Sequence, residues 1–208
     1  AKLSTLLTAV GQIVPDRPVA AFRMGRFNLG PRMMAVLERF PQIAVDSSIL
    51  PMRRYPDGPL RLAAPASPYF PDLAAPWQTG SSRILEVPVT VTPIYPAIAS
   101  ACDRFADQFP GGARPAIWLA SRLGAWTAQP MDTGPLRLRA AAQAHQRRGG
   151  EVLCLYFHSS ELMPGGCARH PTASQVQRFL AKLETYLSWL RERLGAEPAT
   201  LSAIARQY

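Results

Sequence analysis

Short apolar segments that each end in polar residues constrain the fold of this chain more than any other feature. Residues 19–22, 43–45 and 152–156 form three such segments. Their β-branched, aliphatic and aromatic content is typical of buried strands. In barrels built from parallel strands, functional side chains follow the C-terminal ends of the strands. We therefore expect these three strand ends to share one rim.

The polar residues that follow the three segments are the candidate functional groups. They are Arg23 and Arg26 at the first end, Asp46, Ser47 and Ser48 at the second, and His158 and Glu161 at the third. A histidine capping a strand beside a solvated serine turn would explain the third end equally well. The serines of the second end have no adjacent base in the sequence, which favours loop hydrogen bonding over a nucleophilic role.

Helices are predicted between the strands from apolar spacing and terminal signals. Residues 84–90 read as a further strand, in which Pro88 marks an edge or an end, and Glu86 could face the interior or the solvent. Residues 115–119 read as another short strand. The predicted helices span residues 3–14, 32–40, 97–109, 135–147, 172–194 and 201–208. This alternation predicts an α/β fold.

Length and composition fit one domain covering residues 1–208. The chain has 208 residues and a hydrophobic content of 48%, which suffices for a substantial core. No apolar run approaches the roughly 20 residues that cross a bilayer, so we expect no transmembrane segment. The three cysteines form no C-x-x-C pair, and their odd number favours a reducing, cytoplasmic location.

The formal net charge of +9 raises the question of a nucleic-acid partner. Lysine occurs only at Lys2 and Lys182, and the arginines are scattered in a chain rich in alanine and proline. No recognition helix or zinc finger accompanies them, so we expect no nucleic-acid binding. Arginine binds phosphate and carboxylate in a bidentate manner, which suits an anionic polysaccharide or a lipid-linked sugar phosphate.

Residues 51–76 are rich in proline, which excludes a long helix or a central strand. One interpretation is an irregular excursion over the surface. The other is a loop that faces a carbohydrate substrate, because long loops of this kind are often functional. In that case Tyr69 and Trp77, together with Tyr55 and Phe70, would stack on sugar rings, and Asp57 would bond hydroxyl groups.

Four segments in a fixed order carry a resemblance to a known family. They are F-R-M-G-R-F at residues 22–27, V-D-S-S-I-L-P at 45–51, I-L-E-V-P-V-T at 84–90 and F-H-S-S-E-L-M-P-G at 157–165. In this combination the chain resembles the polysaccharide deacetylases with nodulation-B homology, in the branch found in bacterial surface-polysaccharide gene clusters. The resemblance extends over residues 2–201. It implies an incomplete or distorted (β/α) barrel and metal-dependent removal of an N-acetyl group from a sugar.

The chain departs from the family in its metal-binding motifs. Family members hold zinc or a similar divalent ion with an Asp-rich strand end and a His-x-x-x-His or His-x-His element. The three histidines here, His145, His158 and His170, have no metal-ligand spacing. We therefore expect the metal ligands to lie in an N-terminal segment outside this sequence. We also expect these 208 residues to be inactive alone. A barrel edge left uncovered would favour a homo-oligomer.

The resemblance implies a role for each candidate residue. His158 would be the general acid that protonates the leaving amine, Arg23 would orient the basic aspartate of the family, and Asp46 would support the imidazole. Arg26 would bind substrate or that aspartate, or be a surface residue at a helix start. Glu161 would orient His158 or cap the next turn, and Ser47 and Ser48 would shape the substrate loop. The alternative is a non-catalytic relative that binds a glycan or a protein partner.

Overall fold

Three short parallel strands organise the half of the molecule that carries the candidate residues. They are β1 (Ala21–Phe22), β2 (Val45–Asp46) and β3 (Leu85–Glu86), in the order β1-β2-β3. They are seen in a computed structural model that describes residues 2–27, 29–51, 64–109 and 111–208. The register pairs Phe22 with Asp46 and Asp46 with Glu86, so the three strands end side by side.

A second sheet is antiparallel and joins β4 (Val91–Pro93) to β5 (Ala125–Thr127). Helices separate the strands along the chain, so the α/β class expected from the sequence is confirmed. The strands are only two or three residues long, because bends, turns and short helices interrupt the apolar segments. Of the predicted strand 84–90, only residues 85–86 form a strand, β3, and β4 begins at residue 91.

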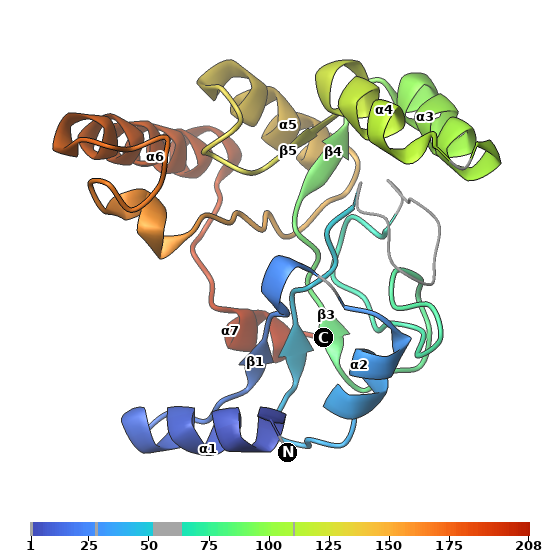
Figure 1. The fold of residues 1–208 in the computed structure, drawn as a ribbon, viewed down its shortest axis with the longest axis vertical. Coiled ribbons are helices and arrows are strands. Elements are labelled where there is room, and N and C mark those ends of the chain that lie inside the picture. Colours follow the sequence, from blue (N-terminus) through green and yellow to red (C-terminus); the bar gives the residue numbers. More distant parts are fainter. Residues whose placement is uncertain (1, 28, 52–63, 110) are drawn as a thin grey trace.

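The helices lie around the two sheets (Figure 1). The parallel sheet shares the lower half of that view with α1, α2 and α7, while β4, β5 and the remaining helices form the upper half. The bounds are α1 (Lys2–Ile13), α2 (Pro31–Leu37), α3 (Pro96–Gln108), α4 (Ala113–Leu119), α5 (Pro135–Arg147), α6 (Ala173–Leu194) and α7 (Leu201–Ala205). Three further turns are η1 (Gly25–Phe27), the π-helical η2 (Ala120–Gly124) and η3 (Ser159–Leu162).

Apolar side chains bury both faces of the parallel sheet. One cluster joins the strands to the C-terminal helix α7 and contains Val45, Leu85, Val87, Val89, Cys154 and Ile204. A second cluster joins them to α2 and contains Leu29, Met34, Leu37, Ile43, Ile49, Trp77 and Ile84. Burial of this apolar area is the main force that holds the sheet between its helices. None of the helices in the described part of the chain is long and apolar enough to traverse a bilayer.

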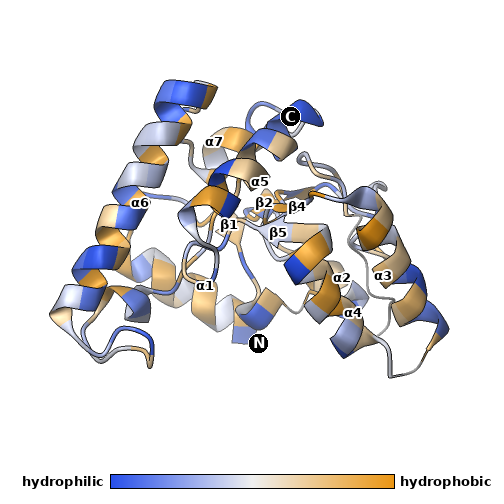
Figure 2. Ribbon diagram, turned by 90° about the horizontal axis from the view of Figure 1, so that it is seen from above, coloured by the Kyte–Doolittle hydropathy of each residue, from blue (hydrophilic) through white to orange (hydrophobic). Residues whose placement is uncertain are grey.

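The longest helix, α6, has the ends that the sequence predicts. Thr172 is the N-cap, and its side chain and that of Gln175 form a capping box. Gly195 ends the helix with a φ of 65°, a conformation that costs glycine little. Figure 2 shows hydrophobic and hydrophilic residues alternating along α6, as expected of a helix that buries one face.

The prediction of a strand at residues 115–119 is wrong, because these residues belong to α4. Pro115 lies in the first turn of the helix, where a missing N–H leaves no hydrogen bond unmade. Trp118 is 62% exposed, which does not fit the interior position that an apolar strand would give it. Proline near the start of an apolar run therefore marked a helix here.

The prediction of a strand at residues 152–156 is also wrong. The segment is extended, and Thr90 N–H donates to the carbonyl oxygen of Cys154 over 3.1 Å. The return bond goes from Cys154 N–H to the side-chain oxygen of Thr90, at 2.9 Å. The threonine hydroxyl thus takes the place of a backbone acceptor, and no ladder forms.

Replacing Thr172 tests the contribution of the capping box. Thr172→Ala removes the oxygen that accepts from Gln175 N–H, and we expect the free energy of unfolding to fall by about 1 kcal/mol in urea denaturation. Thr172→Ser keeps a hydroxyl and should change it much less. Equal losses in the two variants would contradict this account of the cap.

Candidate functional site

Arg23 connects the ends of two strands with the segment that precedes His158. Its Nε donates to the carbonyl oxygen of Ser47 at 2.8 Å and its Nη2 to Ser47 Oγ at 2.6 Å. The same Nη2 lies 3.3 Å from the Sγ of Cys154. The residue follows β1, Ser47 follows β2, and the three segments that the sequence analysis singled out therefore meet.

The serines of the second end are fully buried and shape the loop. Ser47 Oγ donates to the carbonyl oxygen of Val87 at 2.7 Å. Ser48 Oγ donates to Asp46 Oδ1 at 2.7 Å and accepts from the backbone N–H of Met24 at 2.7 Å. Both hydroxyls are occupied by these structural bonds, in agreement with the loop-shaping role.

Asp46 and Glu86 form a buried carboxyl pair beneath this loop. The register places them directly opposite one another on β2 and β3, and both are 0% exposed. Burial, and next the neighbouring Asp46 carboxylate, raise the pKa of Glu86 well above its ordinary value. Burial also raises the pKa of Asp46, whose carboxylate accepts from the backbone N–H and the hydroxyl of Ser48. Glu86 is therefore the protonated member of the pair.

The carboxyl pair also holds the start of the loop that follows β2. Glu86 Oε1 accepts from the backbone N–H of Ile49 at 2.9 Å, and Asp46 Oδ2 accepts from Ser48 N–H at 3.1 Å. These bonds tie the loop backbone to β3. The sequence left the direction of Glu86 open, and the structure turns it inward. A single acidic residue in the apolar run 84–89 was the signal of such a buried group.

The turn after β1 has an uncommon backbone conformation. Arg26 and Phe27 both have a positive φ, 58° and 52°, which side chains with a Cβ atom rarely adopt. Phe27 packs edge-on against Tyr156 at a centroid distance of 4.8 Å and lies under the Arg23 guanidinium, 5.6 Å away. Arg26 is exposed and has no hydrogen bond or ion pair with another described residue. The turn thus aims the aromatic ring inward and leaves Arg26 available.

His158 and Glu161 form the only histidine–carboxylate pair among the described residues. His158 Nδ1 lies 2.9 Å from Glu161 Oε1, the imidazole side chain is 68% exposed and the carboxylate side chain 8%. A carboxylate only accepts hydrogen bonds, so Nδ1 carries the proton and Nε2 is left for a ligand. Of the two roles considered for Glu161, the geometry matches orientation of His158, since η3 has no side-chain cap.

Asp46 does not make the contact with the imidazole that the resemblance implies. It is fully buried, bonded to Ser48 and placed opposite Glu86, whereas His158 is exposed and held by Glu161. The strand register explains the difference, because it points Asp46 at Glu86 inside the sheet. Glu161 occupies the supporting position in its place.

Tyr156 lies between the arginine end and the histidine end of the site. Its pKa is raised by burial first and then by the negative charge of Glu161, and Arg23 acts in the opposite direction. Its ring packs against Phe27, which lies under the Arg23 guanidinium, and it precedes His158 by two residues along the chain. Arg23, Tyr156, Glu161 and His158 therefore form one neighbourhood, which we call the rim cluster.

The prediction that Tyr69 and Trp77 stack on sugar rings is wrong for this structure. They are only 6% and 5% exposed, and Trp77 belongs to the core cluster on α2. Tyr69 Oη donates to the carbonyl oxygen of Pro76 at 2.7 Å. Both rings are therefore packed in the interior and not exposed to the solvent. Tyr55 and Asp57 lie outside the described residues.

The other two histidines have structural roles. His145 is buried, its Nε2 lies 2.9 Å from the carbonyl oxygen of Val152, and burial lowers its pKa. His170 is also buried, with Nδ1 2.7 Å from the carbonyl oxygen of Glu161. Within the described ranges no three His, Cys, Asp or Glu side chains are grouped so that they could hold a metal ion. The described residues therefore do not fit the divalent ion that the resemblance implies.

Comparisons with protein-family models, with curated proteins and with solved structures found no match to this chain.

Sequence reasoning missed a group of basic side chains around the start of α6. They are Arg169, Arg178 and Lys182, which line one cavity. The spacing of four residues between Arg178 and Lys182 was the available signal, since it places both on one helix face.

Glu86→Gln tests the protonation state of the buried pair. Because folding raises the pKa of Glu86 above its ordinary 4.5, the folded protein retains a proton that the unfolded chain releases. The free energy of unfolding should therefore fall as the pH rises above that value, by up to about 1.4 kcal/mol per pH unit. Glutamine mimics the protonated acid, and the variant should lose this part of the pH dependence.

The measurement is urea denaturation at a series of pH values, with Glu192→Gln on the exposed side of α6 as the control. The control should follow the unsubstituted protein. If Glu86→Gln retained the full pH dependence, the assignment of the proton to Glu86 would be wrong.

Proposed function

We propose that this chain is part of a carbohydrate N-deacetylase that hydrolyses an amide on a cell-surface glycan or its precursor. The observation that carries the proposal is the rim cluster: an exposed imidazole held by a buried carboxylate at 2.9 Å, following a segment that Arg23 joins to the second strand end. The order of the sequence segments adds to it through the resemblance described above. The proposal includes the distorted or incomplete (β/α) barrel of that family as the architecture of the complete protein.

In this proposal His158 is the general acid. When the C–N bond of the acetamide breaks, Nε2 gives its proton to the amine nitrogen that leaves the sugar. Glu161 accepts from Nδ1, which fixes the orientation of the ring. Positioned proton transfer of this kind contributes about 10²–10⁴-fold to a rate.

Arg23 has a positioning role in the same proposal. Its guanidinium is committed to Ser47 and Cys154, so it fixes the segment that leads to His158 relative to the second strand end. Its guanidinium also lies over the ring of Phe27, which packs against Tyr156. Arg26, exposed on the neighbouring turn, is a candidate contact for the sugar.

The divalent ion of the family is not assigned to the described residues, since no ligand group exists among them. No step above depends on a metal. His158, Glu161 and Arg23 are not assigned to the activation of the attacking water. A metal titration of the complete protein therefore belongs to its test.

A second candidate function is binding of a glycan without hydrolysis. The missing ligand group among the described residues favours it. An exposed imidazole and arginines at a rim can bind sugar hydroxyls and anionic substituents without catalysing a reaction. The two candidates differ in whether acetate is released, which is directly measurable.

The test measures acetate and free amine released from N-acetylglucosamine oligomers by the complete protein, with and without added zinc. We expect His158→Gln to lower kcat by about 10²–10⁴-fold. Glu161→Gln keeps a hydrogen-bonding side chain without the charge and should lower kcat by a smaller factor, with little change in KM.

Glu184→Gln, an exposed change on α6, serves as the matched control and should retain full activity. Circular dichroism would establish that each variant is folded. Full turnover by His158→Gln would contradict the proposed acid. Binding of the oligomers without acetate release under any metal condition would favour the second candidate.

A further inference from the structure

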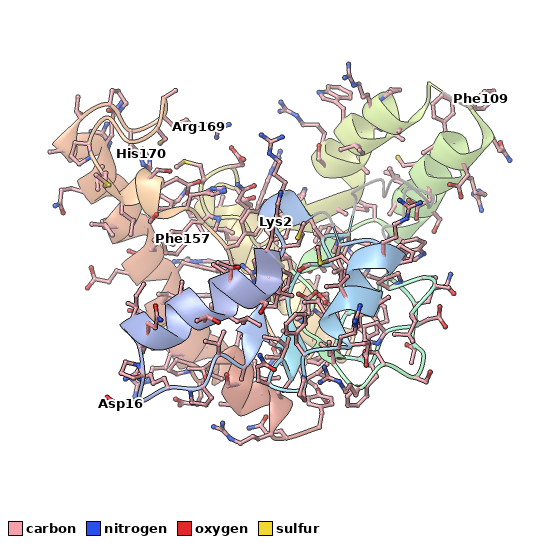
Figure 3. The ribbon with its side chains drawn as sticks, turned by 60° about the horizontal axis from the view of Figure 1, so that its bottom comes forward. Lys2, Asp16, Phe109, Phe157, Arg169 and His170 are labelled. Carbon is pink, nitrogen blue, oxygen red and sulfur yellow. The ribbon has the colours of Figure 1, made fainter. Side chains whose placement is uncertain are left out.

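A cavity of about 350 Å³ lies beside the first half of α6, and its lining contains several basic side chains. Gln175, Arg178, Phe179 and Lys182 line it from the helix, at a spacing that places them on one face. Arg169 and His170 close it from the preceding loop. Figure 3 shows Arg169 and His170 close together, on the opposite side of the molecule from Phe109.

The cavity has an excess of positive charge. Arg169, Arg178 and Lys182 line it, and no acidic residue does. Arg169 has an ion pair with Asp132, but Arg178 is bonded only to Ser174 Oγ, at 3.0 Å. Within the described part of the chain, neither Arg178 nor Lys182 has a carboxylate partner.

Lys182 is held in place without being neutralised. Its Nζ donates to the backbone carbonyl oxygens of Pro130 and Thr133 and lies 5.6 Å from the centre of the Phe179 ring. Burial lowers its pKa, because the ammonium group has lost water and gained no opposite charge. An anion in the cavity would offset that loss.

The floor of the cavity strengthens its charges. Phe179 is 3% exposed and packs against His170 and Phe157, with centroid distances of 5.0 and 6.0 Å. An apolar floor lowers the local dielectric constant, so charges above it interact more strongly than in water. The volume falls within the range of small-molecule sites and exceeds what one small inorganic ion needs.

The cavity and the rim cluster share a wall. Glu161 holds His158 with its side chain at 2.9 Å, and its carbonyl oxygen lies 2.7 Å from Nδ1 of His170 in the cavity lining. The turn η3 thus separates the two sites. A ligand that filled the cavity could extend to the imidazole across one short turn.

We propose that this cavity binds the phosphate or diphosphate group of a sugar phosphate. Arginine forms bidentate contacts with phosphate, and two uncompensated cations match a multiply charged anion better than a single carboxylate. That the sugar phosphate is the substrate rests on the proposed function, because the sugar would then carry its acetamide to His158. Binding of the phosphate group itself does not depend on the proposed function.

The test is isothermal titration calorimetry with the complete protein and inorganic pyrophosphate at low salt. We expect binding that weakens as salt rises from about 0.05 to 0.5 M, since ions screen such contacts. Arg178→Gln should weaken it by about tenfold or more. Its only described side-chain bond, to Ser174, lies at the exposed surface, so this variant should fold normally.

Arg191→Gln is the matched control, because it alters the same residue type on the same helix, about 20 Å from Arg178. It should bind pyrophosphate as the unsubstituted protein does. Lys182→Met is a second cavity variant and should also weaken binding. Absence of pyrophosphate binding, or equal affinity in Arg178→Gln and Arg191→Gln, would overturn the proposal.

Three further titrations identify the ligand. N-acetylglucosamine 1-phosphate should bind more tightly than either inorganic phosphate or N-acetylglucosamine. If inorganic phosphate bound as tightly as the sugar phosphate, the cavity would take a free anion and the sugar assignment would be wrong. If pyrophosphate bound but no N-acetylated sugar were hydrolysed, the deacetylase proposal would fail while the phosphate site remained.

Discussion

The proton that the buried pair of Asp46 and Glu86 retains is the constraint on which the candidate site depends. Two carboxylates that face each other without water would repel one another strongly, so the sheet can close only if one of them stays protonated. With that proton in place, the pair binds the backbone of Ser48 and Ile49. The loop then presents Ser47 to Arg23, and Arg23 reaches Cys154. The rim cluster is the last member of this series of contacts.

The arrangement divides the site into a rigid base and an accessible edge. Asp46, Ser47, Ser48 and Glu86 are buried and make hydrogen bonds that hold the loop, so they support the site from below. Arg23, Arg26 and His158 are exposed and meet the solvent. Such a division is what a binding or catalytic site requires, since fixed neighbours limit the motion of the groups that contact a ligand.

Local signals in the sequence predicted much of this fold, and tertiary contacts account for the failures. The ends of α6 follow from Thr172 and Gly195, whose effects are local. The pairing of His158 with Glu161 is also local, at a spacing of three residues. By contrast, the burial of Trp77 and the inward direction of Glu86 depend on partners from distant segments. The failed strand at 152–156 depended on a hydroxyl at Thr90, far away in the chain.

The positive φ angles of Arg26 and Phe27 have a consequence for how this chain tolerates substitution. Each such residue costs about 1–2 kcal/mol relative to an ordinary conformation, which glycine or asparagine at the same position would largely recover. A glycine in place of Phe27 would also remove the ring that contacts Tyr156 and Arg23. Selection for thermal robustness and selection for a well-oriented guanidinium would therefore act in opposite directions on this turn.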